Sequence, residues 1–97
     1  PVVGIEISGS SEIVKGYSQN YIATKYADES EPIEGVDFTF EIILGDTPVD
    51  ACNLEIISTI ECKITANSSL YNIILRAIET DNIENYADKV ISLVSLF

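Results

Sequence analysis

Apolar and polar residues alternate along most of this chain, and the alternation predicts a protein built from β-strands. The clearest example runs from residue 36 to residue 42, where the apolar members are Val36, Phe38, Phe40 and Ile42. A period of two places one set of side chains on the buried face of a sheet. Pro32 and Gly35 come just before this segment, and both favour the turn that would lead into it. We therefore expect a strand that directs its two phenylalanines into a core.

Six further segments show the same short alternation and are separated by turn-forming residues. They run over residues 3–8, 17–27, 52–56, 60–66, 71–79 and 87–95. The apolar run 90–96 is the one place where a helix is an alternative, but its β-branched residues and its lack of capping residues favour a strand. Short strands without any helical periodicity indicate an all-β sandwich of about seven antiparallel strands.

The alternation also predicts which side chains face the core. Tyr21 and Ala23 are the inward candidates of the second segment. The inward side of the sixth segment consists of Tyr71, Ile73, Leu75 and Ala77. Tyr71 stands near the start of its strand and two residues before an inward apolar residue, which is the position of a tyrosine corner. We expect its hydroxyl to bind nearby backbone.

Some apolar residues are expected on the surface instead. Ile74 and Ile78 lie on the outward side of the sixth segment, where they would form a patch that docks a neighbouring domain. Two residues at the end of the sequence would complete this patch, Leu96 and Phe97. Tyr17, Tyr26 and Tyr86 lie at strand ends, where exposed tyrosines stack on sugar rings or anchor interfaces. Packing at the rim of the sandwich is the alternative for all three tyrosines.

The two cysteines fall on neighbouring strands. A short loop at Ser58 and Thr59 would join the segments 52–56 and 60–66 into a hairpin. In that register Leu54 pairs with Cys62, so Cys52 and Cys62 stand on diagonal positions. Diagonal Cα atoms are roughly 7–8 Å apart, which exceeds the comfortable reach of a disulfide. Buried free thiols are therefore favoured over the alternative, a disulfide bond.

The charge of the chain limits the classes of partner that it can bind. There are 16 acidic residues against 5 basic ones, which gives a formal net charge of −11. Such a surface repels phosphates and anionic lipid, so we expect neither nucleic-acid binding nor membrane insertion. Histidine is absent, and with it the usual general base at neutral pH. We therefore expect no enzymatic activity.

The length of 97 residues corresponds to one domain with a single core. Position 1 is occupied by Pro1 rather than by methionine. This start suggests a domain excised from a larger protein or a processed chain, so residues 1–97 are treated as a single module.

Several short motifs occur in an order that resembles the immunoglobulin-like domains of bacteria and phages. The first is I-x-I-x-G at residues 5–9, and the second is G-x-S-x-x-Y-x-A at residues 16–23. The stretch from Pro32 to Phe40 is similar to the P-V-x-G-V-x-F stretch of intimin- and invasin-type repeats. The likeness continues through the two C-terminal strands, 71–77 and 89–94. Because tryptophan is absent, the Cys…Trp…Cys core of antibody domains is missing.

The resemblance implies an immunoglobulin-like β-sandwich, in which the loops after the second and sixth strands lie at the same end. Calcium binds about six to eight oxygen ligands, and these loops are rich in carboxylates. The candidate calcium ligands are Asp28, Glu29, Glu31, Asp81 and Glu84. Solvated loop charge without a bound ion is the alternative.

The resemblance also implies a function. It favours a non-catalytic display or spacer module of a phage tail or virion structural protein that contacts host cell-surface glycans or proteins. The alternative is an adhesin or cell-wall stalk repeat of a bacterial surface protein, stiffened by calcium. Either role places the chain outside the cell or on a virion, beside neighbouring domains of the same protein. A carbohydrate-acting enzyme or its inhibitor is a third class. Because the ligands of such domains vary widely, the likeness does not identify the partner.

Overall fold

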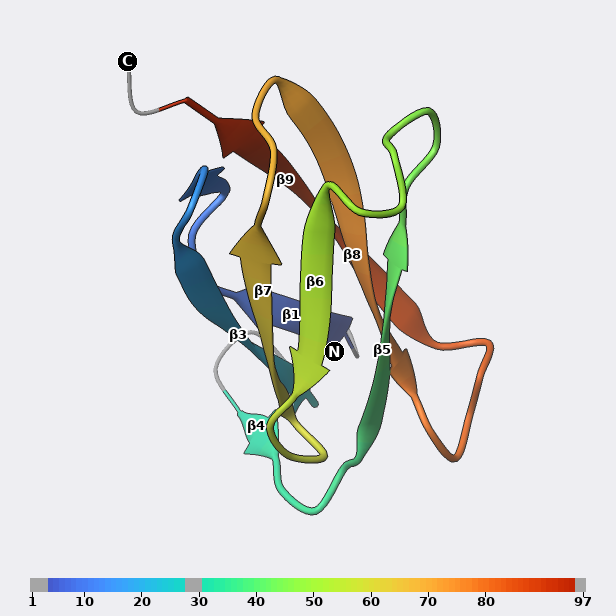
Figure 1. Cartoon of the computed structure of the whole chain (residues 1–97). Helices are drawn as coiled ribbons and strands as arrows, with labels where there is room; N and C mark the ends of the chain where they lie inside the picture. Colours follow the sequence, from blue (N-terminus) through green and yellow to red (C-terminus); the bar gives the residue numbers. More distant parts are fainter. Residues whose placement is uncertain (1–3, 28–30, 96–97) are drawn as a thin grey trace.

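The chain is all-β. The computed structural model describes residues 4–27 and 31–95, and within this part the chain consists of strands, turns and loops only (Figure 1). Nine strands are described, and they form two sheets. No helix long and apolar enough to cross a membrane occurs among the described residues.

Sheet A has the strand order β1-β3-β7-β6, and the short β4 pairs with the end of β3. Its strands are β1 (Gly4–Ser8), β3 (Ser18–Tyr26), β4 (Pro32–Ile33), β6 (Cys52–Ile56) and β7 (Glu61–Ala66). All pairings in this sheet are antiparallel. The first strand, β1, lies at an edge of this sheet. Val3, which was expected within it, lies outside the described residues.

Sheet B has the strand order β2-β9-β8-β5. Its strands are β2 (Glu12–Val14), β5 (Phe38–Ile43), β8 (Tyr71–Glu79) and β9 (Tyr86–Val94). The expectation of about seven strands, all antiparallel, is corrected here in two ways. The short β2 and β4 raise the number of described strands to nine, and β2 runs parallel to β9.

A glycine lies where the chain passes from sheet A to sheet B. Gly9 follows the last residue of β1 and has a φ of +145°. A Cβ atom built on Gly9 would lie 2.4 Å from Cδ1 of Tyr21. Only glycine therefore fits both the backbone conformation and the neighbouring ring, and the chain can leave one sheet here and join the other as β2.

The core lies between the two sheets, and the alternation predicted its members well. Phe38 and Phe40 are buried, as are Tyr21 and Ala23 on the opposite sheet. In β8, the inward residues Ile73, Leu75 and Ala77 are fully buried. Burial of one face of each sheet explains why a buried apolar residue recurs at every second position of these strands.

The tyrosine that binds backbone is Tyr21, not Tyr71. The Tyr21 hydroxyl donates a hydrogen bond of 2.6 Å to the backbone oxygen of Ser10. The prediction of a tyrosine corner at Tyr71 is wrong, because that side chain is exposed at the start of β8 and makes no hydrogen bond to any residue that the structure describes. Tyr21 ties β3 to the segment that crosses between the sheets.

The register of the β6–β7 hairpin differs from the prediction by two residues. Cys52 pairs with Ala66 and Ile56 pairs with Cys62, so Cys62 does not pair with Leu54. The hairpin loop is longer than expected, because the backbone N–H groups of both Ile57 and Ser58 donate to the oxygen of Glu61.

The longer loop has two consequences. Cys52 and Cys62 are separated beyond a diagonal pair, and both are buried free thiols, as the favoured alternative predicted. Ile56 and Ile60 stand at even spacing from the buried Cys52 and Cys62, so the alternation predicts them on the inner face, but both are exposed. Ile56 ends its strand at the edge of the sheet, and Ile60 lies in the loop.

An ion pair joins the two sheets at the lower end of the molecule in Figure 1. Lys25 at the end of β3 binds Glu79 at the end of β8, with 2.7 Å between Nζ and Oε1. Asn85 also donates to this carboxylate at 3.4 Å. Because Lys25 donates to the Glu79 carboxylate, the pKa of Glu79 is lowered. The C-terminal ends of β3 and β8 therefore lie at the same end of the molecule, as expected.

Candidate binding surface

The outer face of sheet B carries the most developed surface feature. In β8, Ile73, Leu75 and Ala77 point into the core, so the side chains at the alternate positions point away from it. The cross-strand pairings place neighbours from β5 and β9 beside these outward residues. The outer face is thus a series of rows, each running across three strands.

One of these rows is entirely aliphatic. Ile74 pairs with Ile43 of β5 and with Val90 of β9. Val90 has 60% of its surface exposed, and Ile43 and Ile74 are half-buried. We call these three residues the aliphatic row. Side chains in direct cross-strand pairs lie close enough to contact, so the row forms a continuous apolar strip on the surface.

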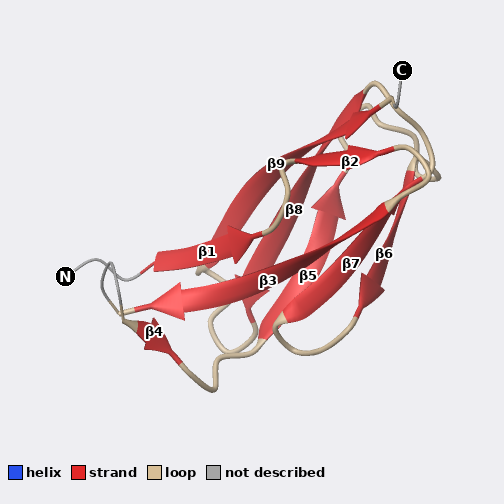
Figure 2. Ribbon diagram, turned by 90° about the vertical axis from the view of Figure 1, so that its left-hand side faces the viewer, coloured by secondary structure: helices blue, strands red, loops and turns tan. Residues whose placement is uncertain are grey.

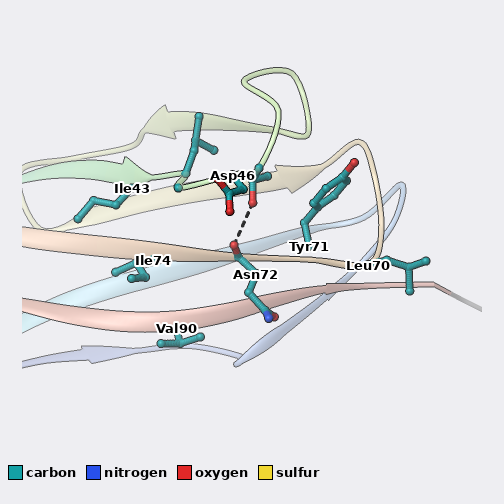
Figure 3. Close-up of a pocket in the computed structure, with 10 residues that line it drawn as sticks. Ile43, Asp46, Leu70, Tyr71, Asn72, Ile74 and Val90 are labelled. Atoms are coloured by element: carbon teal, nitrogen blue, oxygen red, sulfur yellow. Dashed lines mark hydrogen bonds between the residues drawn. The ribbon is translucent and has the colours of Figure 1, made fainter.

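A pocket with a volume of about 460 Å³ lies over the aliphatic row. Figure 3 shows the strip closed at one end by the turn after β5 and by the start of β8. The other residues around it are Leu44, Gly45, Asp46, Thr47, Leu70, Tyr71 and Asn72. The volume is within the range of small-molecule pockets in proteins.

Hydrogen bonds hold the turn that closes the pocket. The Thr47 hydroxyl donates to the backbone oxygen of Asn72 at 3.0 Å (Figure 3). The Thr47 N–H donates to the oxygen of Leu44 at 2.9 Å. Thr47 is the one buried polar side chain among the described residues. Its two bonds fix the wall of the pocket relative to β8.

Leu70 has an unusual backbone at the rim of the pocket. Its φ is +69°, and no other non-glycine residue among those described has a positive φ. Such a conformation costs on the order of 1 kcal/mol for a residue with a Cβ. The Leu70 N–H donates to the oxygen of Leu93 at 2.7 Å, which holds the residue in place. Its side chain is 86% exposed, so the strained backbone presents an apolar group to solvent.

A charged row borders the aliphatic row. Arg76 pairs with Glu41 and Asp88 across the strands. Its guanidinium donates to both oxygens of Asp88, at 2.7 and 3.0 Å, and lies 4.1 Å from the centre of the Tyr86 ring. Hydrogen bonding to Arg76 lowers the pKa of Asp88, and the same bond raises the pKa of Arg76. With Asp46 at the opposite side, the surroundings of the pocket carry a negative charge.

The structure divides the predicted binding residues between two places. Ile74 lies in the aliphatic row. Ile78 and Tyr86 pair with each other on the same outer face, beyond the charged row. Tyr26 is half-buried at the end of β3 in sheet A, so it does not join the others. Leu96 and Phe97 lie outside the described residues.

Sequence reasoning missed most of the pocket. Of the residues around it, only Ile74 was named as a binding candidate; the apolar and aromatic ones that were missed include Ile43, Leu70, Tyr71 and Val90. A signal was present for two of them: Ile42–Ile43 and Val90–Ile91 are apolar pairs that break the alternation. One member of each pair must face away from the core. Leu70 carried no such signal, because its backbone conformation is set by the turn.

The predicted calcium ligands are only partly described. Asp28 and Glu29 lie outside the described residues, whereas Glu31, Asp81 and Glu84 are exposed. Within residues 4–27 and 31–95, no group of three or more His, Cys, Asp or Glu side chains is arranged to hold a metal ion. Calcium binding at this end of the molecule stays a prediction.

Two buried groups are held in their neutral forms. Burial raises the pKa of the Cys62 thiol to about 12, with a smaller contribution from Glu61. Burial likewise raises the pKa of Tyr21, its partner across the strands, to about 12. At neutral pH, both groups are protonated and enclosed by the core, so neither serves the surface described above.

Comparisons with known proteins add no relative: no protein-family model, curated protein or solved structure matches this chain.

Proposed function

We propose that the chain is an immunoglobulin-like module that serves as a non-catalytic display or spacer domain of a phage tail or virion structural protein. The strand order supports the immunoglobulin-like part of this proposal. With β1, β3, β5, β6, β7, β8 and β9 lettered A to G, sheet A follows the order A-B-E-D and sheet B includes G-F-C. The two sheets of immunoglobulin-like sandwiches have these strand orders, which supports this part of the proposal. The strands β2 and β4 are additions to that frame.

The shape of the fold supports a role as a spacer. The molecule measures 43 × 22 × 22 Å. Figure 2 shows β1 beginning toward one end of the long axis and β9 ending toward the other. A module with this path extends a polypeptide along its own length, as a tail protein or a stalk requires. Its acidic surface, with a net charge of −11, keeps such an exposed module soluble.

The observation that carries the proposal is the aliphatic row with its pocket. Soluble monomers rarely expose a large contiguous apolar patch, and patches with a polar rim mark interaction sites. Here the row is bordered by Glu41 and Asp88 on one side and by Asp46 on another. We expect it to receive an apolar side chain from a neighbouring polypeptide, with lysine or arginine beside that side chain.

The alternative function is an adhesin or cell-wall stalk repeat on a bacterial surface. The end-to-end path of the chain favours this role equally, because tandem modules of a stalk are joined in the same way. The two roles differ in where the protein resides. Both place it outside the cell and in contact with host-surface or neighbouring molecules.

Immunogold microscopy separates the two roles. Antibodies against the domain would be applied to intact phage particles and to intact cells of the bacterium that carries the gene. We expect gold on the tail or virion. Gold on the cell wall alone would support the stalk, and retention inside the cell would contradict both roles.

Photo-crosslinking tests the docking surface within the assembled protein. A photoreactive residue at position 90 lies on the aliphatic row, and one at position 53 lies on the outer face of sheet A, where Asn53 is exposed. We expect a crosslink to a neighbouring polypeptide from position 90 and none from position 53. Equal crosslinking from both positions would contradict a role for the row.

A further inference from the structure

A second pocket lies beside the turn that joins β2 to β3, and it shares no residue with the first pocket. Its volume is about 370 Å³. The residues around it are Ser10, Glu12, Val14, Tyr17, Ser18 and Gln19. In contrast to the aliphatic row, this pocket combines one aromatic ring with several polar side chains.

Tyr17 is an exposed ring on a fixed base. Its N–H donates to the oxygen of Val14 at 2.9 Å, and its oxygen accepts from the N–H of Ala66 at 3.0 Å. Gly16 precedes it with a φ of +90°, which closes the turn. The backbone of Tyr17 is therefore held against both β2 and β7, whereas 59% of the residue is exposed. Such a ring loses little conformational freedom when a ligand covers it.

The polar side chains of the pocket differ in availability. The Ser10 hydroxyl donates to the oxygen of Glu12 at 2.8 Å, and the Ser18 hydroxyl is bonded to Thr65 at 2.7 Å. Three other polar groups have no hydrogen-bond partner among the described residues. They are the side-chain amide of Gln19, the carboxylate of Glu12 and the hydroxyl of Tyr17. The pocket thus offers donors and acceptors beside a flat apolar surface.

We propose that this pocket binds one ring of a neutral saccharide, a pyranose whose substituents are all equatorial. Such a ring presents axial C–H groups on its two faces and hydroxyl groups around its edge. The faces match the Tyr17 ring, and the edge matches the amide of Gln19 and the carboxylate of Glu12. A net charge of −11 opposes anionic sugars. The inference rests on the proposed function, in which the module contacts host-surface molecules, and it names glycans as those molecules.

The other exposed tyrosines fit this role less well. The Tyr86 ring has the Arg76 guanidinium over one face. Tyr71 stands beside the aliphatic row, in a pocket lined mainly by apolar side chains. Tyr17 is the most exposed of these three tyrosines, and its pocket also holds the unpaired side chains of Gln19 and Glu12.

Nuclear magnetic resonance titration of the folded domain with cellotriose and with tri-N-acetylchitotriose tests the inference. We expect at least one of the two to shift the backbone amide signals of Tyr17, Ser18 and Gln19, with a Kd on the order of 1 mM, as suits a small contact area. Tyr17→Ala should weaken binding at least about tenfold. Tyr17→Phe should retain it, because the ring face remains. Tyr86→Ala is the matched control and should leave the affinity unchanged.

Two results would overturn the inference. One is the absence of shifts at these amides with either saccharide up to about 20 mM, since a site weaker than that has no useful affinity. The other is unchanged binding by Tyr17→Ala with a wild-type melting temperature. If either result is obtained while immunogold microscopy still places the domain on the virion, the saccharide site is refuted and the proposed function is not. Binding at Tyr17 without labelling of particles or cell walls refutes the proposed function alone.

Discussion

At the scale of single residues, the fold depends on a small cluster where the chain changes sheets. Gly9, Ser10 and Tyr21 meet there: the Tyr21 ring lies against the backbone of Gly9, and its hydroxyl binds the oxygen of Ser10. The cluster joins β3 of sheet A to the segment that leads into β2 of sheet B. Substitutions at these positions should therefore weaken the whole domain.

Replacement of Gly9 by alanine tests this cluster. The new Cβ would clash with the Tyr21 ring at 2.4 Å and would approach the oxygen of Asn20 to 2.9 Å. We expect Gly9→Ala to lower the free energy of unfolding by about 2 kcal/mol or more, measured by urea denaturation. Gly4→Ala is the matched control, because a Cβ there meets nothing within 4 Å. Equal stability of the two variants would refute the role of Gly9.

Alkaline pH should unfold the domain through two buried groups. The folded-state pKa values of Tyr21 and Cys62 are raised by burial to about 12, from 10.0 and 9.0 respectively. Both groups are neutral when protonated, so their contribution to stability is complete below the unfolded-state pKa values. It is lost as the pH rises toward about 12.

The melting temperature measured at a series of pH values would show this effect. We expect it to fall steeply above about pH 9 in the wild type, and less steeply in the double variant Tyr21→Phe, Cys62→Ala. The double variant has a lower stability at neutral pH, so the slopes are compared rather than the absolute values. If the melting temperatures of the wild type and the double variant fell in parallel with pH, neither group would ionise on unfolding.

At the scale of elements, the alternation predicted long strands well and short ones poorly. It identified the inward faces of β3, β5 and β8, because each of these strands has at least six residues and one buried side. The two-residue β4 and the three-residue β2 are too short to show a period. The parallel pairing of β2 with β9 links residues far apart in the sequence, which no local pattern reveals.

The alternation alone was also not enough to predict the register of the β6–β7 hairpin or the pocket. A hairpin loop sets its register through its length, and the loop between β6 and β7 is longer than its residue types suggested. The outward position of Ile74 was predicted from its buried neighbours. The pocket around it also required the turn held by Thr47 and the positive φ of Leu70, which arise from tertiary contacts.

The β6–β7 register predicts the redox state of the cysteines. Cys52 and Cys62 pair with different partners in the hairpin, Ala66 and Ile56, and neither is bonded. We expect the folded domain, purified without reductant, to react slowly with a thiol reagent such as Ellman's reagent. In urea, both thiols should react rapidly. A disulfide in the unreduced protein, detected by mass spectrometry after alkylation, would contradict this register.

At the scale of the whole molecule, the charge is the dominant feature. A net charge of −11 produces repulsion within the folded state. Only two ion pairs are found among the described residues, Lys25–Glu79 and Arg76–Asp88. Arg76–Asp88 is partly exposed and contributes little. Lys25–Glu79 is more enclosed, so salt screens it less. Screening of the repulsion should therefore outweigh the weakening of these pairs.

Salt should accordingly stabilise the domain. We expect the melting temperature to rise by a few degrees between about 10 mM and about 300 mM NaCl, because the Debye length shortens over this range. Calcium chloride at the same ionic strength provides a comparison. A further rise with calcium would support ion binding at the acidic loops, whereas equal values would contradict the calcium prediction.

The central claim is that the aliphatic row is not part of the core and is left for a partner. Val90 and Ile91 are adjacent in β9 but lie on opposite faces, and Ile91 is fully buried. Urea denaturation of Val90→Ser and Ile91→Ser tests the claim most directly. We predict a loss of less than about 1 kcal/mol for Val90→Ser and at least about 3 kcal/mol for Ile91→Ser. Comparable losses for the two variants would contradict the claim, since Val90 would then stabilise the fold itself.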